Sequence, residues 1–415
     1  MVKFLIFLLL HCFHSLTVYS IDGFDFSKLG EGADFKVVVK HVGQGSCTII
    51  ENQYNGRLAI IDAGSSTSTP FNLDDEIVKE LGGACVRRSL PAMDGDITLV
   101  VSHSDQDHIN VLHSVYTKNS RFFAHFPKVI LGDHFANYYK SSDSKALLRR
   151  IVGNLQNPPD QVVALSHNIA VTDDFFRAED DSMITSDPYQ VEYLGYREHV
   201  SIPGFLSSYQ EENGLVFEIL SVNAGAGTKD IRDENTNSAV VRLGINKRNI
   251  LIMGDATGVT TQRILLNPEN KKMLKGLSLL ISSHHGGRLD ETNNGLWLGF
   301  TSPERVAISA GYHGGYRHPN AEFLMDLIIV DSLVHDIPHD IALSGSEESS
   351  EYYVKSLASH MEFKKFSEIQ NKEKTKTYKW LIFMTDLAVH STGSSGSLYY
   401  VYNIKGELVS FWKEN

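Results

Sequence analysis

The chain has 415 residues, of which 42% are hydrophobic and 21% are charged, and its formal net charge is −12 at pH 7. A chain of this length and composition can bury one large core or fold as two globular domains. The acidic balance excludes an overall field that would gather nucleic acid or an anionic membrane, although a local basic groove stays possible.

Residues 1–20 have the pattern of a secretory signal peptide. Lys3 gives a positive start, Phe4–Leu10 is apolar, and Val18–Ser20 offers side chains of modest size before a cleavage site. The alternative is an uncleaved anchor, but the apolar stretch is short for a membrane span and histidines interrupt it. We therefore expect a secreted or periplasmic protein without stable membrane insertion.

Cysteine usage fits export without proving a disulfide. Cleavage of the signal would remove Cys12 and leave Cys47 and Cys85. These two residues could pair in an oxidising compartment, or they could remain as buried thiols. Neither lies in a spacing typical of a zinc–thiolate site.

The first half of the chain alternates apolar strands with polar turns. We expect strands at 35–40, 47–51, 58–61, 97–101 and 129–131, and helices at 71–92 and 109–116. Gly43 and Gly45 follow the first strand, and they predict either a hairpin turn or a close approach of two backbone segments. The stretch 135–215 is interpreted as an insertion or a set of surface loops.

The second half continues the alternation. We expect further strands at 216–220, 239–243, 249–253, 277–281, 305–309 and 398–401, and helices at 260–274 and 321–330. Residues 35–320 are expected to form the main domain. Residues 321–415 are expected to be a C-terminal extension that completes its sheets.

Ionisable side chains stand where apolar strands end. Asp62 follows the strand 58–61, and the strand 97–101 leads into the segment 102–108. That segment holds four potential ligands, His103, Asp105, Asp107 and His108. Such clustering is costly in a protein interior unless a bound cation compensates it. The alternative is a polar loop in which Asp105 or Asp107 caps a helix.

Further ionisable residues follow later strands, namely Asp255, His284 and His318. Rigid strands in a layered sheet structure would carry all these loops to one rim, where a metal site could form. Asp62 is placed to hydrogen bond a metal-ligating histidine and fix its orientation, or else it is a turn-forming residue.

A series of motifs carries a resemblance to a known family. They are His41–Gly45, Ile61–Gly64, His103–His108, Asn237–Ser238 ahead of Met253–Asp255, His284–Gly287 and Arg317–Pro319. Their order resembles that of the metallo-β-lactamase superfamily, and within it the soluble hydrolase domain of ComEC-type DNA-uptake proteins. The resemblance implies an α/β fold, the αββα sandwich, in which two mixed β-sheets face each other with helices outside and metal at one edge.

The resemblance also implies roles for the matching residues. Asp107, His108 and His284 would bind the cation of the second position, His103 a cation of the first, and Asp255 would bridge the two. Asp107 would also orient the attacking water or accept its proton, Asp62 would steady a ligand, and His318 would stabilise charge or protonate a leaving group.

The chain departs from the family pattern at the first position. Asp105 stands where a histidine is usual, and the loop before Asn237 lacks the histidine of the family's third motif. We expect one or two divalent ions, with zinc foremost. Manganese or iron is also possible, because a carboxylate in place of an imidazole favours a harder cation. A weakened first position is the other consequence.

The implied function is a metal-dependent hydrolase, foremost a phosphodiesterase or nuclease that uses a metal-activated hydroxide. Its substrate could be a small phosphodiester or a nucleic acid. The same fold could instead host a lactone, ester or amide hydrolase, or a catalytically weak secreted effector or binding protein, since fold does not decide function.

Overall fold

The computed structural model describes residues 34–65 except 41 and 43–44, 97–118, 128–138 except 135–136, 161–164, 195–288 except 231–232, 292–310, 318–320, 323, 326, 341–344 and 397–413. Several expected features lie outside these residues: the signal sequence, the helix at 71–92 and Cys85. Of the expected helix at 321–330, only positions 323 and 326 are described. These features, and the boundaries of the expected domains, stay predictions.

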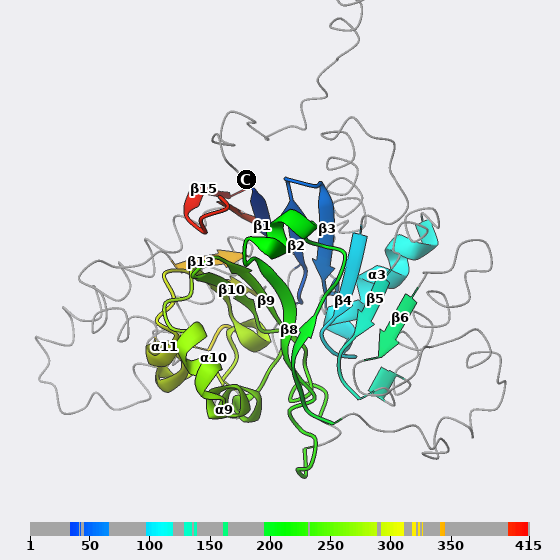
Figure 1. Ribbon diagram of the computed structural model, residues 1–415. Coiled ribbons are helices and arrows are strands. Elements are labelled where there is room, and N and C mark those ends of the chain that lie inside the picture. Colours follow the sequence, from blue (N-terminus) through cyan, green and yellow to red (C-terminus); the bar gives the residue numbers. More distant parts are fainter. Residues whose placement is uncertain are drawn as a thin grey trace, which may run out of the picture.

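The first sheet has eight strands in the order β15-β14-β1-β2-β3-β4-β5-β6 (Figure 1). Their bounds are β1 Phe35–Val39, β2 Thr48–Asn52, β3 Arg57–Ile61, β4 Ile97–Val101, β5 Lys128–Leu131, β6 Gln161–Ala164, β14 Leu398–Tyr402 and β15 Leu408–Lys413. Pairing is antiparallel from β15 to β3 and parallel from β3 to β6, so the sheet is mixed.

The second sheet has seven strands in the order β13-β12-β11-β10-β9-β8-β7. Their bounds are β7 Arg197–Ser201, β8 Val216–Val222, β9 Val240–Ile245, β10 Arg248–Ile252, β11 Leu279–Ile281, β12 Val306–Ser309 and β13 Ile341–Ser344. Strands β7 to β10 pair in antiparallel fashion and β10 to β13 in parallel, so this sheet is mixed as well.

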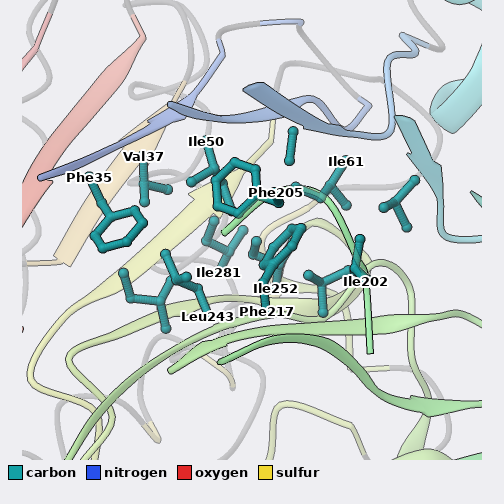
Figure 2. Packing of buried hydrophobic residues seen from close by; sticks show 14 of the residues in the cluster. Phe35, Val37, Ile50, Ile61, Ile202, Phe205, Phe217, Leu243, Ile252 and Ile281 are labelled. Carbon is teal, nitrogen blue, oxygen red and sulfur yellow. The ribbon is translucent and has the colours of Figure 1, made fainter. Parts of the chain in front are cut away.

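The main core lies between the two sheets. Alternate residues of each strand point inward, because successive side chains of a strand face opposite sides. Figure 2 shows such residues from both sheets filling one space: Phe35, Val37, Ile50 and Ile61 from the first sheet, and Phe217, Leu243, Ile252 and Ile281 from the second. The burial of this shared face holds the sheets together.

Helices lie outside the sheets. Helices α9 (Gly258–Leu266), α10 (Pro268–Met273) and α11 (Gly295–Thr301) pack on the second sheet through a separate buried cluster that includes Ile264, Leu280 and Trp297. Helix α3 (Gln106–Lys118) connects the parallel neighbours β4 and β5 and lies on the outer face of the first sheet, since the second sheet covers the inner one. The predicted fold class, an αββα sandwich, is confirmed.

The single helix expected at 260–274 is wrong. Helix α9 ends at Leu266 and α10 begins at Pro268. Proline has no backbone N–H and cannot continue a preceding helix, but it is well suited to start a new one. The side chain of Asn267 caps α10 by accepting a hydrogen bond of 3.0 Å from the backbone N–H of Glu269.

The two segments whose structure was hardest to predict, 135–215 and 321–415, contribute edge strands. Within 135–215, β6 ends the first sheet and β7 ends the second, and a short helix, α8 (Ser208–Glu212), precedes β8. Within 321–415, β13 joins the second sheet, and β14 and β15 join the first. No helix in the described part of the chain is long and apolar enough to cross a membrane.

The core between the sheets predicts a clear contrast between two leucines. Leu243 is fully buried there, whereas Leu266 is 80% exposed at the end of α9. Leu243→Ala should lower the free energy of unfolding by about 2–5 kcal/mol because it leaves a cavity. Leu266→Ala should change it by no more than about 0.5 kcal/mol. Urea unfolding of both variants checks this, and equal losses would contradict the described packing.

Candidate metal centre

The site forms where strands of both sheets end. Asp62 follows β3 directly, and the segment from Ser102 to His108 follows β4. Asp255 and His285 follow β10 and β11 in the second sheet. Because β3 and β4 are parallel, and β10 and β11 are parallel, their carboxyl ends lie at common edges of the two sheets. The loops that leave these edges meet at one rim of the sandwich.

Two groups of potential ligands overlap at this rim. His103, His108 and Asp255 form one, and Asp107, His108 and His285 form the other, with the ligand atoms of each group within 4.8 Å of one another. Asp255 of the first group also approaches the second, since its Oδ1 is 3.0 Å from Nε2 of His108 and its Oδ2 is 3.7 Å from Nε2 of His285. The carboxylate of Asp107 is 3.2 Å from Nε2 of His285.

These atoms fit a divalent cation. The buried Nε2 atoms of His103, His108 and His285, and Oδ1 of Asp255, have no hydrogen-bond partner within the described residues. Buried polar atoms normally have partners, so their convergence requires another group. Ligand atoms around zinc, at about 2.0–2.2 Å from the metal, stand roughly 3–3.6 Å apart. The separations between Asp107, Asp255 and the imidazoles lie close to that range.

Hydrogen bonds behind the rings turn Nε2 toward the centre. Nδ1 of His108 donates to Oδ2 of Asp62 over 2.8 Å, and both side chains are fully buried. Nδ1 of His285 donates to the carbonyl of Ser309 over 2.9 Å. A bond of this kind fixes both the tautomer and the orientation of a metal-binding imidazole.

The loop around Gly45 supports the ligand segment from behind. The backbone N–H of Ser46 donates to the carbonyl of Asp107, and that of Ala63 donates to the carbonyl of His108. A Cβ on Gly64 would lie 2.4 Å from the carbonyl oxygen of Asp107, and one on Gly45 would lie 2.2 Å from that of Gly64. Gly45 thus makes the predicted close backbone approach, within the turn that joins the antiparallel strands β1 and β2, whereas Gly43 lies outside the described residues.

Electrostatics keep the carboxylates ionised and His318 neutral. Burial alone would raise the pKa of Asp107, but the nearby imidazoles of His285 and His108 outweigh it and hold this pKa below its usual range. Burial lowers the pKa of His318 to about 3, and the neighbouring His285 and His284 add to this effect.

Two predicted ligands lie outside both groups. The side chain of Asp105 is 45% exposed, and its Oδ2 is 3.6 Å from Nε2 of His103. Nε2 of His284 is 3.9 Å from Oδ2 of Asp255. The predicted catalytic residue His318 lies beside the groups, with its ring centre 5.2 Å from that of His284.

His285, the neighbour of the predicted ligand His284, belongs to the second group. Both histidines have left-handed backbone conformations, with φ of 48° and 53°, in a turn (η3, Ser283–Gly286) that follows β11. This backbone decides which of the two adjacent imidazoles faces Asp107, and the bond to Ser309 then holds it. The pair His284-His285 offers no sequence signal that separates them, because the strand length and the turn conformation are both needed.

Comparisons with known proteins find matches among solved structures. No protein-family model and no curated protein matches the chain. Twelve chains of solved structures match it, including one titled "Crystal Structure of a New Diphosphatase from the PhnP Family". That structure has 13% sequence identity and a TM-score of 0.33, and the match covers 74% of this chain and 94% of that chain. A likeness at this level carries no argument about function.

Substitution of His285 and substitution of His284 should affect zinc binding differently. His285→Ala removes a potential ligand that contacts Asp107 and Asp255, so zinc affinity should fall by at least the ~10–100-fold typical of changes behind a ligand. His284→Ala should leave zinc affinity within a few-fold of the wild type. Titration with zinc against a competing chelator measures both. A larger loss in His284→Ala would show that the site uses the other imidazole.

A buried carboxyl group, Asp133, supports the loop that carries His103. It follows β5 and accepts hydrogen bonds from the Ser104 hydroxyl (2.9 Å), the Asn137 amide (2.8 Å) and the His134 backbone N–H (2.5 Å). Burial raises its pKa from 3.8 to about 7, although these donors and His103 favour the ionised form.

This raised pKa makes stability depend on pH. Between pH 3.8 and about 7 the unfolded chain has released the proton of Asp133 while the folded chain retains it. The free energy of unfolding should therefore fall as pH rises through this window, by up to about 4 kcal/mol. Asp133→Asn should remove that part of the slope. Urea unfolding at several pH values tests this, and parallel slopes for wild type and variant would contradict it.

Proposed function

We propose that the chain is a metal-dependent hydrolase of the metallo-β-lactamase superfamily that cleaves phosphodiester bonds. The observation that carries the proposal is the pair of ligand groups that share His108 at a buried rim, with Asp255 of the first group 3.7 Å from His285 of the second. If each group held a cation, the two together would suit in-line displacement at phosphorus. The order of motifs, which resembles that of ComEC-type hydrolase domains, supports the same chemistry.

The residues present favour zinc. His103, His108 and His285 offer imidazole nitrogen, and Asp107 and Asp255 offer carboxylate oxygen. Because Asp105 lies outside both groups, the harder-cation argument based on that residue loses weight. Imidazole suits zinc, whereas an oxygen-rich site would suit manganese better. Manganese and iron remain alternatives that a metal analysis can distinguish.

Each side chain has a definable task. A bound divalent cation supplies positive charge for phosphoryl oxygens and lowers the pKa of a bound water toward about 7. Asp107 is ionised and its side chain is 22% exposed, so it can orient an incoming water and accept its proton. Neutral His318 can hydrogen bond a substrate oxygen. Asp62 does not reach the substrate but holds His108 in position.

The acidic chain favours a small substrate over a polynucleotide. Its net charge of −12 opposes the approach of a polyanion, and binding of nucleic acid normally relies on many basic contacts to phosphate. A small phosphodiester or a nucleotide carries few charges and meets less repulsion. We therefore propose a small phosphodiester as the first class to test, with nucleic acid as the second.

Elemental analysis and turnover of bis(p-nitrophenyl) phosphate test the proposal together. Purified protein should retain zinc and hydrolyse this diester, lose activity with a chelator, and regain it when zinc is restored. Asp255→Ala should lose activity by more than about 100-fold, since it removes the carboxylate of the first ligand group that also approaches the second. Leu266→Ala, which changes an exposed residue, serves as the matched control.

Other outcomes select the other functions. Hydrolysis of a lactone or β-lactam without any diester turnover would favour an ester or amide hydrolase on the same fold. A folded protein that binds no metal would favour a catalytically weak effector or binding protein. Either result would overturn the proposed phosphodiesterase activity.

A further inference from the structure

Ser102 lies at the point where β4 meets the ligand segment, and it is fully buried. Its backbone N–H donates to Oδ1 of Asp62 over 2.6 Å, and its hydroxyl lies 2.7 Å from Oδ2 of the same carboxylate. The hydroxyl also lies 2.9 Å from Nδ1 of His103. One serine thus contacts both the carboxylate behind the site and a second imidazole.

The chemistry of the three groups sets the direction of each bond. A carboxylate is only an acceptor, so the hydroxyl proton of Ser102 goes to Asp62. The oxygen of Ser102 then offers a lone pair to His103, which must donate from Nδ1. His108 donates from Nδ1 to the same Oδ2 of Asp62 over 2.8 Å. Both imidazoles therefore carry a proton on Nδ1 and present Nε2 to the ligand groups.

Residues next to strands of both sheets hold Ser102 in place. Its carbonyl accepts a hydrogen bond of 2.9 Å from the backbone N–H of Ala239, next to β9. A Cβ on Gly132 would lie 2.1 Å from that carbonyl oxygen, and a Cβ on Gly254 would lie 2.8 Å from Cβ of Ser102. Gly254 also has a φ of 54°, which favours glycine. This close packing leaves the hydroxyl facing Asp62 and His103.

We propose that Ser102 is a positioning residue for the metal centre, because it relays the hydrogen bond of Asp62 to His103. One carboxylate then sets two imidazoles, His108 directly and His103 through the serine hydroxyl. The proposal rests on the metal-binding part of the proposed function. Loss of the hydroxyl should release His103 and weaken the group of His103, His108 and Asp255. The group of Asp107, His108 and His285 should keep its ligands and their orientation.

Ser102→Ala and Ser278→Ala form a matched pair. Ser278 is also a buried serine, but it precedes β11, at the end of that strand opposite the rim. In zinc titrations against a chelator, Ser102→Ala should bind one zinc about 10–100-fold more weakly than the wild type and the other with unchanged affinity. Ser278→Ala should bind both as the wild type does. Equal zinc affinities in Ser102→Ala and wild type would overturn the relay.

Proton NMR of the zinc-loaded protein gives a second readout. The wild type should show protected Nδ1–H signals for both His103 and His108, and Ser102→Ala should lose only that of His103. If Ser102→Ala fails to fold, the wild type still decides, because absence of a protected His103 signal overturns the relay. Wild-type protein without diester turnover but with these signals would refute the proposed phosphodiesterase and leave the relay intact.

Discussion

One constraint organises the rim: buried imidazole and carboxylate atoms there have no hydrogen-bond partner of their own. The Nε2 atoms of three histidines and an oxygen of Asp255 converge without a hydrogen-bond partner among the described residues. Such an arrangement is costly in a protein interior unless another group satisfies it. A cation satisfies all of these atoms at once, because every one of them can donate a lone pair. The metal proposal therefore rests on the free-energy cost of leaving these buried atoms without a partner, as well as on the types of residue present.

The sandwich makes this arrangement possible because each ligand follows a strand end or begins a helix. His103 follows β4 of the first sheet, Asp107 and His108 lie in the first turn of α3, and Asp255 and His285 follow β10 and β11 of the second sheet. The two sheets that position these residues share one apolar core (Figure 2). Close backbone contacts at Gly64 and Gly254 further restrict these segments. Preorganised ligands of this kind need no reordering when a metal or substrate binds.

The sequence was informative wherever a local pattern decided the structure. The strands that carry the site and the motif from His103 to His108 could be predicted because apolar runs and polar loops alternate there. Pro268 marked a helix break that a purely periodic interpretation overlooked. The choice between His284 and His285 depends on a left-handed turn and on a bond to Ser309, which are tertiary features. The edge strands β7 and β15 pair with strands near them in the sequence, β8 and β14, but their own runs are short and show no clear alternation of apolar and polar residues.

Anomalous diffraction from zinc-soaked crystals tests the central claim most directly. The account predicts zinc peaks at the rim, bonded to Nε2 of His108 and His285 and to the carboxylates of Asp107 and Asp255, with a further peak at Nε2 of His103. Absence of zinc at the rim, or zinc bound only by residues elsewhere in the chain, would contradict the claim that these strand ends form a metal centre.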